Sequence, residues 1–205
     1  KVLAKADYPA LIAERDRLRE AGTLAGIGIA ACLEPSGGNS SFEPLLNPKD
    51  STTTWMDSCR ISIDLVGSIT ATMHTTSAGQ GHETLVGTVV GEVLEVDPDK
   101  VRVVRADSLN SLPSNSPVGS RMAIMLGGAA FHAANKLKAK LIAIAAHDLG
   151  ASVERMTYEN GNVFDASSPD KKRSWTELVT ISHRYIHRLP PDMEPGLSVS
   201  HIMPV

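Results

Sequence analysis

Apolar side chains recur at helical spacing in two long stretches of the chain. In residues 82–94 the apolar positions are Leu85, Val86, Val89, Val90 and Val93. This spacing predicts a helix that buries one face and stops at Asp97-Pro98. The second stretch runs from about residue 121 to 149, and Gly150 suits the position after its end. Its first half is rich in glycine and alanine, so we expect close contact with a neighbouring strand or a cofactor.

Alternating apolar and polar residues predict strands in three other segments. Residues 59–65 and 69–74 flank the turn residues Gly67-Ser68 and predict a β-hairpin. Residues 100–107 alternate in the same way and predict a further strand. The apolar run 24–33 is expected to form a buried strand. Its two glycines are not a dinucleotide fingerprint, because no third glycine or helix start follows them.

Shorter elements are predicted towards both ends of the chain. Asp7 is a candidate cap for an exposed helix over residues 8–19, which Gly22 would end. Asn160-Gly161 predicts a hairpin turn.

A capping-box pattern from Ser174 to Glu177 predicts a short helix to about residue 187. Residues 34–50 and 108–120 are predicted loops, and the tail after Pro190 is predicted to be irregular. Together these elements predict an α+β fold with mixed sheets and two long helices, each preceded by a glycine loop.

Length and composition narrow the class of protein. The 205 residues suffice for one large domain, or for two lobes of about 1–75 and 76–205. A net charge of −3 and the lack of a basic run argue against nucleic acid as a partner. No apolar run reaches the length of a membrane span. The chain begins without Met, which suggests a piece of a longer protein.

The two cysteines, Cys32 and Cys59, do not form a disulfide framework or a metal quartet. They favour a reduced, cytoplasmic protein with two buried, structural thiols.

The loop at residues 77–81 is the first candidate for binding chemistry. Gly79 and Gly81 bracket Gln80 between a predicted strand and a predicted helix. Glycines let the backbone approach a ligand, and the N–H groups at a helix start bind anions. Gly119-Ser120-Arg121 repeats the arrangement before the second long helix. A phosphate site and a simple tight turn both fit this pattern.

Other catalytic or metal sites have weaker support in the sequence. His82-Glu83 does not extend to HExxH, and His183 and His187 lack an evident third ligand. Ser77 and Ser120 lack the elbow of a serine nucleophile. Met122 and Met125 are expected in the core.

Three motifs in this order resemble the molybdenum-binding large subunit of the molybdenum hydroxylases. This family includes xanthine dehydrogenase, aldehyde oxidase and aerobic carbon monoxide dehydrogenase. The motifs are Gly79-Gln80-Gly81-His82-Glu83-Thr84, then residues 101–107, then Gly119-Ser120-Arg121. Residues 7–10, 26–30 and 34–37 are similar to the carbon monoxide dehydrogenase type.

The resemblance implies that the chain is the second molybdopterin-binding lobe of such a subunit. Gly79 to Thr84 would then bind the pterin and pyrophosphate of a molybdopterin, in its cytosine dinucleotide form, with Gln80 near the pterin. Gly119, Ser120 and Arg121 would form the second wall. The activity implied is oxidation of a small molecule, by C–H hydroxylation with oxygen from water or by oxidation of carbon monoxide.

The implied partners are the rest of the molybdenum subunit and the iron–sulfur and flavin subunits, in a higher oligomer. Electrons would leave through 2Fe-2S clusters to FAD on those partners.

Two departures from the family pattern affect the second wall. Asp107-Ser108 replaces Asp-Thr, and Met122-Ala123 follows Ser120-Arg121 where Ser-Thr is usual. Met122 either removes a hydrogen bond to the cofactor or reshapes the wall. The family's catalytic glutamate and substrate loop have no counterpart here, so no catalytic or metal-ligating residue is assigned.

The isolated segment is therefore expected to bind cofactor weakly and to be inactive. A non-catalytic assembly fragment and an unrelated nucleotide-binding module remain as alternatives.

Overall fold

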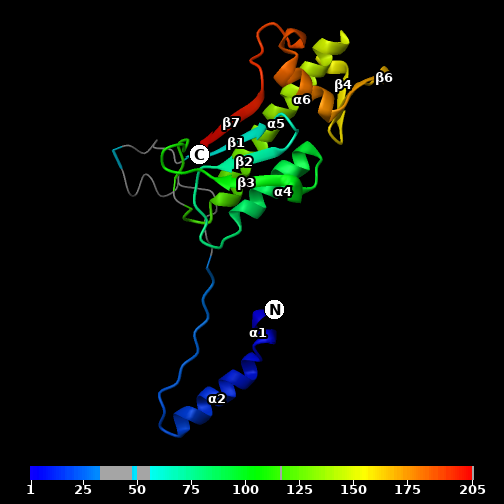
Figure 1. Ribbon diagram of the computed structural model, residues 1–205. Helices are drawn as coiled ribbons and strands as arrows, with labels where there is room; N and C mark the ends of the chain where they lie inside the picture. The colour runs from blue at the N-terminus through cyan, green and yellow to red at the C-terminus, as the bar shows by residue number, and fades with distance from the viewer. Residues whose placement is uncertain (33–47, 50–55, 116, 205) are drawn as a thin grey trace. The chain divides into compact units, whose positions relative to one another are not determined.

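A four-stranded sheet carries the two predicted glycine loops at one of its edges. The structure is a computed structural model that describes residues 1–32, 48–49, 56–115 and 117–204 (Figure 1). The chain divides into two units, Lys1–Glu34 and Pro35–Val205. The sheet lies in the second unit, in the order β3-β2-β1-β7. Its strands are β1 (Met56–Ile63), β2 (Ile69–Met73), β3 (Val101–Arg105) and β7 (Leu197–Pro204).

The pairing of β2 and β3 explains why the two loops emerge together. β1 and β2 form the predicted antiparallel hairpin, whereas β3 runs parallel to β2, with Met73 opposite Arg105. The ends of parallel neighbours lie at the same edge of a sheet. The chain therefore leaves β2 for the first loop beside the point where it leaves β3 for the second. The backbone N–H of Ala106 bonds to the Met73 carbonyl, 2.9 Å away, at that edge.

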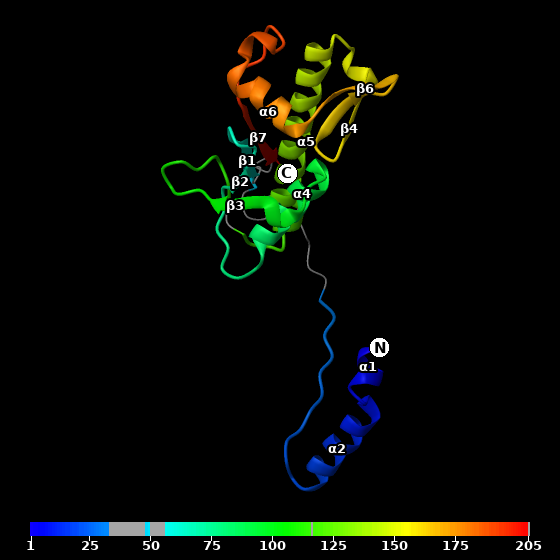
Figure 2. The same ribbon diagram turned by 45° about the vertical axis from the view of Figure 1, so that its right-hand side comes forward.

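Two helices cover one face of this sheet (Figure 2). They are α4 (His82–Leu94) and α5 (Met122–Leu149), and both predictions are confirmed. α5 packs on β1, β7 and α4. Its buried residues include four alanines, at positions 129, 130, 133 and 134. Such small side chains let the helix approach the sheet closely. The sequence predicted close contact with either a strand or a cofactor, and the structure shows contact with strands.

A second sheet, in the order β4-β5-β6, lies towards the C-terminal half of α5 (Figure 1). The predicted hairpin at Asn160-Gly161 is confirmed, and so is the capping box between Ser174 and Glu177. The third strand was not predicted, because its exposed residues lack an apolar alternation. The elements are β4 (Met156–Glu159), β5 (Asn162–Asp165), β6 (Ser168–Arg173) and α6 (Trp175–Arg184), with short 3-10 turns at Pro98–Lys100, Val153–Arg155 and Ile186–Arg188.

The prediction of an irregular tail after Pro190 is wrong for Leu197–Pro204, which form the strand β7. β7 pairs with the whole of β1, with Val199 opposite Ile61. Three prolines precede this strand, and they obscured the apolar alternation inside it. β7 therefore owes its conformation to hydrogen bonds from a strand about 140 residues earlier in the chain.

The first unit contains α1 (Val2–Lys5) and α2 (Tyr8–Glu20). The predicted helix is confirmed, but Asp7 precedes it in a left-handed conformation and makes no side-chain cap bond. The predicted buried strand is wrong for residues 24–32, which form no strand; Leu24 and Cys32 are exposed. The described residues of this unit contain no strand with which this segment could pair.

The predicted loop at residues 34–50 lies outside the described residues, except for the turn at residues 48–49. The sheet combines strands from both sides of residue 75, and a division into lobes there stays a prediction. None of the helices in the described ranges combines the length and apolar character that a membrane span requires.

Candidate functional site

The first glycine loop, residues 77–81, connects β2 to α4. Gly79 has a φ of +103° and Gly81 a φ of +79°, both in the left-handed region that favours glycine. A Cβ added at either position would meet no atom within 4 Å, so both glycines border open space. Gly81 is the N-cap of α4 and offers no side-chain oxygen to the first turn. This arrangement leaves a helix N-terminus facing an open space, which suits an anion.

Two side chains in and after this loop already contact other groups of the protein. Gln80 is exposed, and its Oε1 accepts the N–H of Ala78. His82 is buried, with its Nδ1 3.2 Å from the Thr76 carbonyl oxygen. Their contacts shape the loop from within, so the groups they present outward are mainly backbone groups.

Glu83 connects the start of α4 to the end of β3. Its Oε1 accepts the Nε–H of Arg105 at 2.5 Å. Its own backbone N–H and the Arg105 guanidinium hold the pKa of Glu83 below its usual range. Thr84 lies one residue further along α4 and is exposed. Glu83 therefore stays ionised and fixes α4 to the sheet edge.

The second glycine loop leads into α5 with a similar backbone. Gly119 (φ +65°) and Ser120 (φ +48°) are both left-handed, and a Cβ at Gly119 would also meet no atom within 4 Å. Ser120 has a Cβ, so its conformation costs about 1 kcal/mol or more and requires support from its surroundings. Arg121 is the N-cap of α5 and makes no side-chain cap bond.

The Arg121 side chain is buried, only 1% exposed, and forms an ion pair with Asp57 of β1. Asp57 also accepts a hydrogen bond from the Ser114 hydroxyl, 2.6 Å away. Burial raises the pKa of the Asp57 carboxyl, and Ser114 and Arg121 oppose that effect. Because its guanidinium faces the core, Arg121 is available to a ligand in this conformation mainly through its backbone.

The two loops meet around a cavity of about 360 Å³. It is lined by Gln80, Gly81, His82, Leu85, Pro117, Ser120, Arg121, Met122 and Ala123. Five of the nine predicted site residues are in that lining, although the two groups are about 40 residues apart in the chain. Gly79 and Gly119 are chain neighbours of lining residues. Glu83 and Thr84 lie in the first turn of α4 without lining the cavity.

Leu85 and Asp57 are site features that the sequence did not reveal. Leu85 lies on the predicted apolar face of α4 and was assigned to the core, whereas it is half-buried at the cavity. Asp57 precedes the segment recognised as a strand, and no local pattern connects it with Arg121. Only the pairing of distant segments could have identified it.

The other candidate residues have structural surroundings. Met122 and Met125 are buried, as predicted. The His183 Nε2 lies 3.0 Å from the Ile63 carbonyl oxygen, and His187 is exposed. Within the described ranges, no three His, Cys, Asp or Glu residues form a metal-binding group. Cys59 is buried, and burial raises the pKa of its thiol to about 12, so it is inert at neutral pH.

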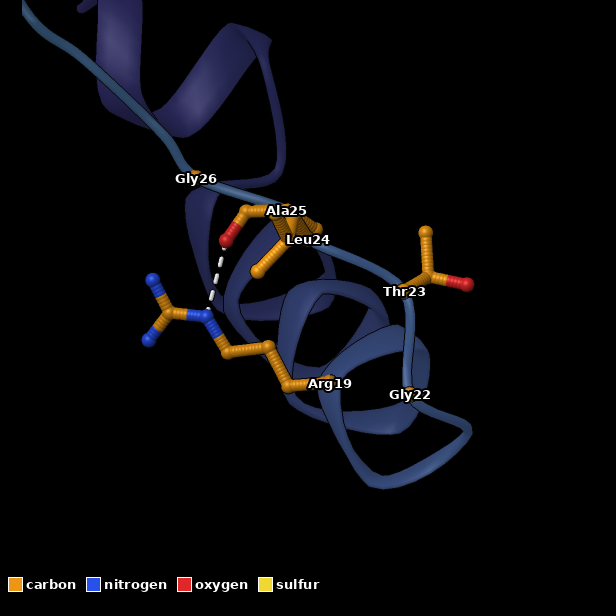
Figure 3. A pocket seen from close by; sticks show the side chains of 6 residues that line it. All are labelled: Arg19, Gly22, Thr23, Leu24, Ala25 and Gly26. Carbon is orange, nitrogen blue, oxygen red and sulfur yellow. Dashed lines mark hydrogen bonds between the residues drawn. The ribbon is translucent and has the colours of Figure 1, made fainter.

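A different cavity of about 600 Å³ lies in the first unit, after the end of α2 (Figure 3). Its wall includes Arg19, whose Nε donates to the Ala25 carbonyl at 2.8 Å. The C-terminal end of a helix presents carbonyl oxygens and a partial negative charge. This cavity therefore lacks the anion-binding arrangement found between the two glycine loops.

The sequence matches known proteins along almost its whole length. The pattern of the molybdopterin cofactor-binding domain matches residues 1–203. The chain is 29% identical to the nicotine 6-hydroxylase large subunit of Paenarthrobacter nicotinovorans, covering 93% of this chain and 23% of that one. It is 32% identical to the carbon monoxide dehydrogenase large chain of Hydrogenophaga pseudoflava, covering 98% and 24%.

The fold agrees with this relationship. The structure is similar to that of quinoline 2-oxidoreductase from Pseudomonas putida 86, with a TM-score of 0.74 and 26% identity over 98% of this chain and 25% of that one. The chain thus spans about a quarter of the length of the relatives it matches. The curated relatives named above are large subunits or large chains.

The expected resemblance to the molybdenum hydroxylases is confirmed, and with it the mixed α+β class. A match over nearly the whole chain excludes the unrelated nucleotide-binding module. The chain belongs to the molybdopterin cofactor-binding domain family, as found in the molybdenum-binding large subunits of molybdenum hydroxylase-type enzymes.

Proposed function

We propose that the two glycine loops hold the molybdopterin of a molybdenum hydroxylase-type oxidoreductase. The observation that carries this proposal is the cavity shared by the N-termini of α4 and α5. The proposed binding residues are Gly79, Gln80, Gly81, His82, Glu83, Thr84, Gly119, Ser120 and Arg121. Family membership supports the identity of the cofactor, and the loop geometry supports its position.

The cavity fits the chemistry of this cofactor. Molybdopterin carries phosphate, and the positive ends of two helix dipoles favour an anion between them. The three glycines with open space at their Cβ positions allow the backbone to approach it. The Gln80 Oε1 accepts the Ala78 N–H, and its amide N–H donors suit the acceptor atoms of a pterin. Leu85 and Met122 offer apolar contact to a flat ring.

The role of this chain is to bind and orient the cofactor. When bound, the molybdenum centre supplies the redox chemistry for oxidising a small molecule, either by C–H hydroxylation or by oxidation of carbon monoxide. No carboxylate lines the cavity among the described residues, and its two ionisable side chains already have protein partners: His82 faces the Thr76 carbonyl, and Arg121 is paired with Asp57. The catalytic base is therefore expected elsewhere in the complete subunit.

The finer assignments extend the family resemblance described above. We propose the cytosine dinucleotide form of the cofactor, and partner subunits that carry 2Fe-2S clusters and FAD in a cytoplasmic higher oligomer. Two relatives are a large subunit and a large chain, and this supports a multisubunit complex.

The test is the cofactor content of the complete protein purified from its host. We expect molybdenum and pterin in equal amounts, with cytidine monophosphate released on hydrolysis. Replacing Gly81 by Ala should lower that content, because the new side chain strains a φ of +79° at the cavity. Gly196→Ala is the matched control, since Gly196 has a φ of +81° and does not line the cavity.

A complete protein without molybdenum or pterin would overturn the proposal. Equal cofactor loss in the two variants would assign the effect to folding instead. Turnover by the isolated 205-residue chain would contradict the assignment of the catalytic base to another part of the subunit.

A further inference from the structure

Asp57 joins the two ends of the segment that forms the second wall of the cavity. It lies on β1, is fully buried, and does not line the cavity. One carboxylate oxygen accepts the Ser114 hydroxyl at 2.6 Å, and the other accepts Nη2–H of Arg121. The wall residues Pro117 and Ser120 lie between these two partners in the chain. A single side chain on the sheet thus contacts the chain both before and after the wall.

Backbone pairing strengthens the first of these contacts. The Asn115 N–H donates to the Met56 carbonyl at 2.9 Å, and the Met56 N–H donates to the Asn115 side chain at 3.2 Å. The Ser58 hydroxyl donates to the Pro113 carbonyl. Residues 113–115 therefore lie along the start of β1, with Asp57 in the middle of the contact.

The wall needs support on both sides because of its backbone. Gly119 and Ser120 are consecutive left-handed residues, and Ser120 has no steric freedom to favour that conformation. A strained residue persists only when its surroundings hold it in place. The Asp57 contacts to Ser114 and Arg121 provide such a hold at both ends.

A buried ion pair is poorly explained by stability alone. Removing two charges from water offsets most of their attraction, and apolar residues of the same volume often stabilise a fold as well or better. The gain from such a pair is then a defined geometry.

We infer that Asp57 is a positioning residue for the cofactor, acting through Ser114 and Arg121 on the wall at residues 117–121. This inference rests on the proposed function of the cavity. It assigns a role to a residue that touches neither the cavity nor its ligand.

The test compares Asp57→Asn with Asp148→Asn in the complete protein. Asn keeps the shape of Asp57 and removes its charge. Asp148 is the matched control because its buried carboxylate binds two arginines near the other end of the same helix. For Asp57→Asn we expect about tenfold faster amide hydrogen exchange at residues 118–123 and about a tenfold loss of bound molybdopterin per folded molecule. Asp148→Asn should change neither quantity.

Ser114→Ala is a second, milder variant, which keeps the test decisive if Asp57→Asn does not fold. It removes one hydrogen bond and leaves the ion pair in place, so a smaller increase in exchange, of about threefold, is expected at the same residues.

The outcomes separate this inference from the proposed function. Unchanged exchange at residues 118–123 in both Asp57→Asn and Ser114→Ala would overturn the positioning role. So would full cofactor retention by Asp57→Asn, or equal cofactor loss in Asp148→Asn. A wild-type protein that binds no molybdopterin would instead refute the proposed function, because exchange measured without cofactor still reports on the wall.

Discussion

The two ends of α5 both use carboxylate–arginine contacts, but they are built in different ways. At the N-terminal end, one arginine, Arg121, binds one fully buried carboxylate, that of Asp57. At the C-terminal end, the Asp148 carboxylate binds both Arg173 and Arg188. These two arginine side chains are 22% and 36% exposed, whereas the side chain of Arg121 is almost completely buried.

The difference separates a contact that selects one conformation from contacts that only add stability. The ion pair between Asp57 and Arg121 is buried, and it lies behind a loop with strained backbone. The Asp148 contacts are redundant and partly solvated, and they join α5 to the second sheet and to the segment after α6. A ligand site requires the first kind of end, because its geometry must not vary.

The largest expected difference concerns the loss of one arginine at each end. Arg121→Ala leaves a fully buried carboxylate without its cation and should lower the free energy of unfolding by about 3–5 kcal/mol. Arg188→Ala leaves Asp148 bound to Arg173 and should cost about 1 kcal/mol. Urea unfolding of both variants measures these losses. Equal losses would show that the two ends are equivalent.

A smaller effect is expected from a pair of matched glycines at the two ends. Gly119 has a φ of +65° and Gly150 a φ of +63°, and an added Cβ would meet no atom within 4 Å at either. Replacing either by Ala should therefore lower stability by a similar amount, about 1 kcal/mol. Only Gly119→Ala should also lower the molybdopterin content, measured as pterin fluorescence per folded protein. Similar cofactor contents in the two variants would argue against a role for the second loop.

The smallest effect is a pH dependence of stability at the C-terminal end. Burial opposes ionisation of Asp148, but Arg188 and Arg173 outweigh it and lower the pKa of the carboxyl. A lowered folded pKa gives stability that is present above the unfolded pKa of about 3.9 and lost as the pH falls through the folded value.

We expect this loss to stay below about 1 kcal/mol, because solvent screens both arginines. Thermal unfolding between pH 5 and about pH 2.5 measures it, with Asp148→Asn as the control that lacks the term. Asp57 should not share this loss, since burial raises the pKa of its carboxyl. If Asp148→Asn loses as much stability in acid as the wild-type protein, the loss belongs to other carboxyl groups.

Much of the second unit follows from local patterns in the sequence. The spacing of apolar residues identified α4 and α5, and Asn160-Gly161 and the capping box at Ser174 identified a turn and a helix start. These signals are local because a helix or a tight turn satisfies its hydrogen bonds within a few residues. The glycines of both loops were recognised for the same reason, since a left-handed turn depends on the residue at that position.

The errors concern elements that depend on distant partners. The apolar run at residues 24–32 has the composition of a strand but forms none, and the segment from Leu197 to Pro204 forms one despite the prolines before it. A strand exists only where a neighbour accepts and donates its backbone hydrogen bonds. Residue composition does not identify that neighbour.

The sequence by itself determined the two glycine loops, the helices that follow them and the family. Tertiary structure decided that the loops share one cavity, because β2 and β3 pair in parallel and end at the same edge. It also decided that the Arg121 side chain points into the core towards Asp57, and not into the cavity. The physical reason is burial: a charged group removed from water must find an opposite charge, and the fold alone determines where that charge lies.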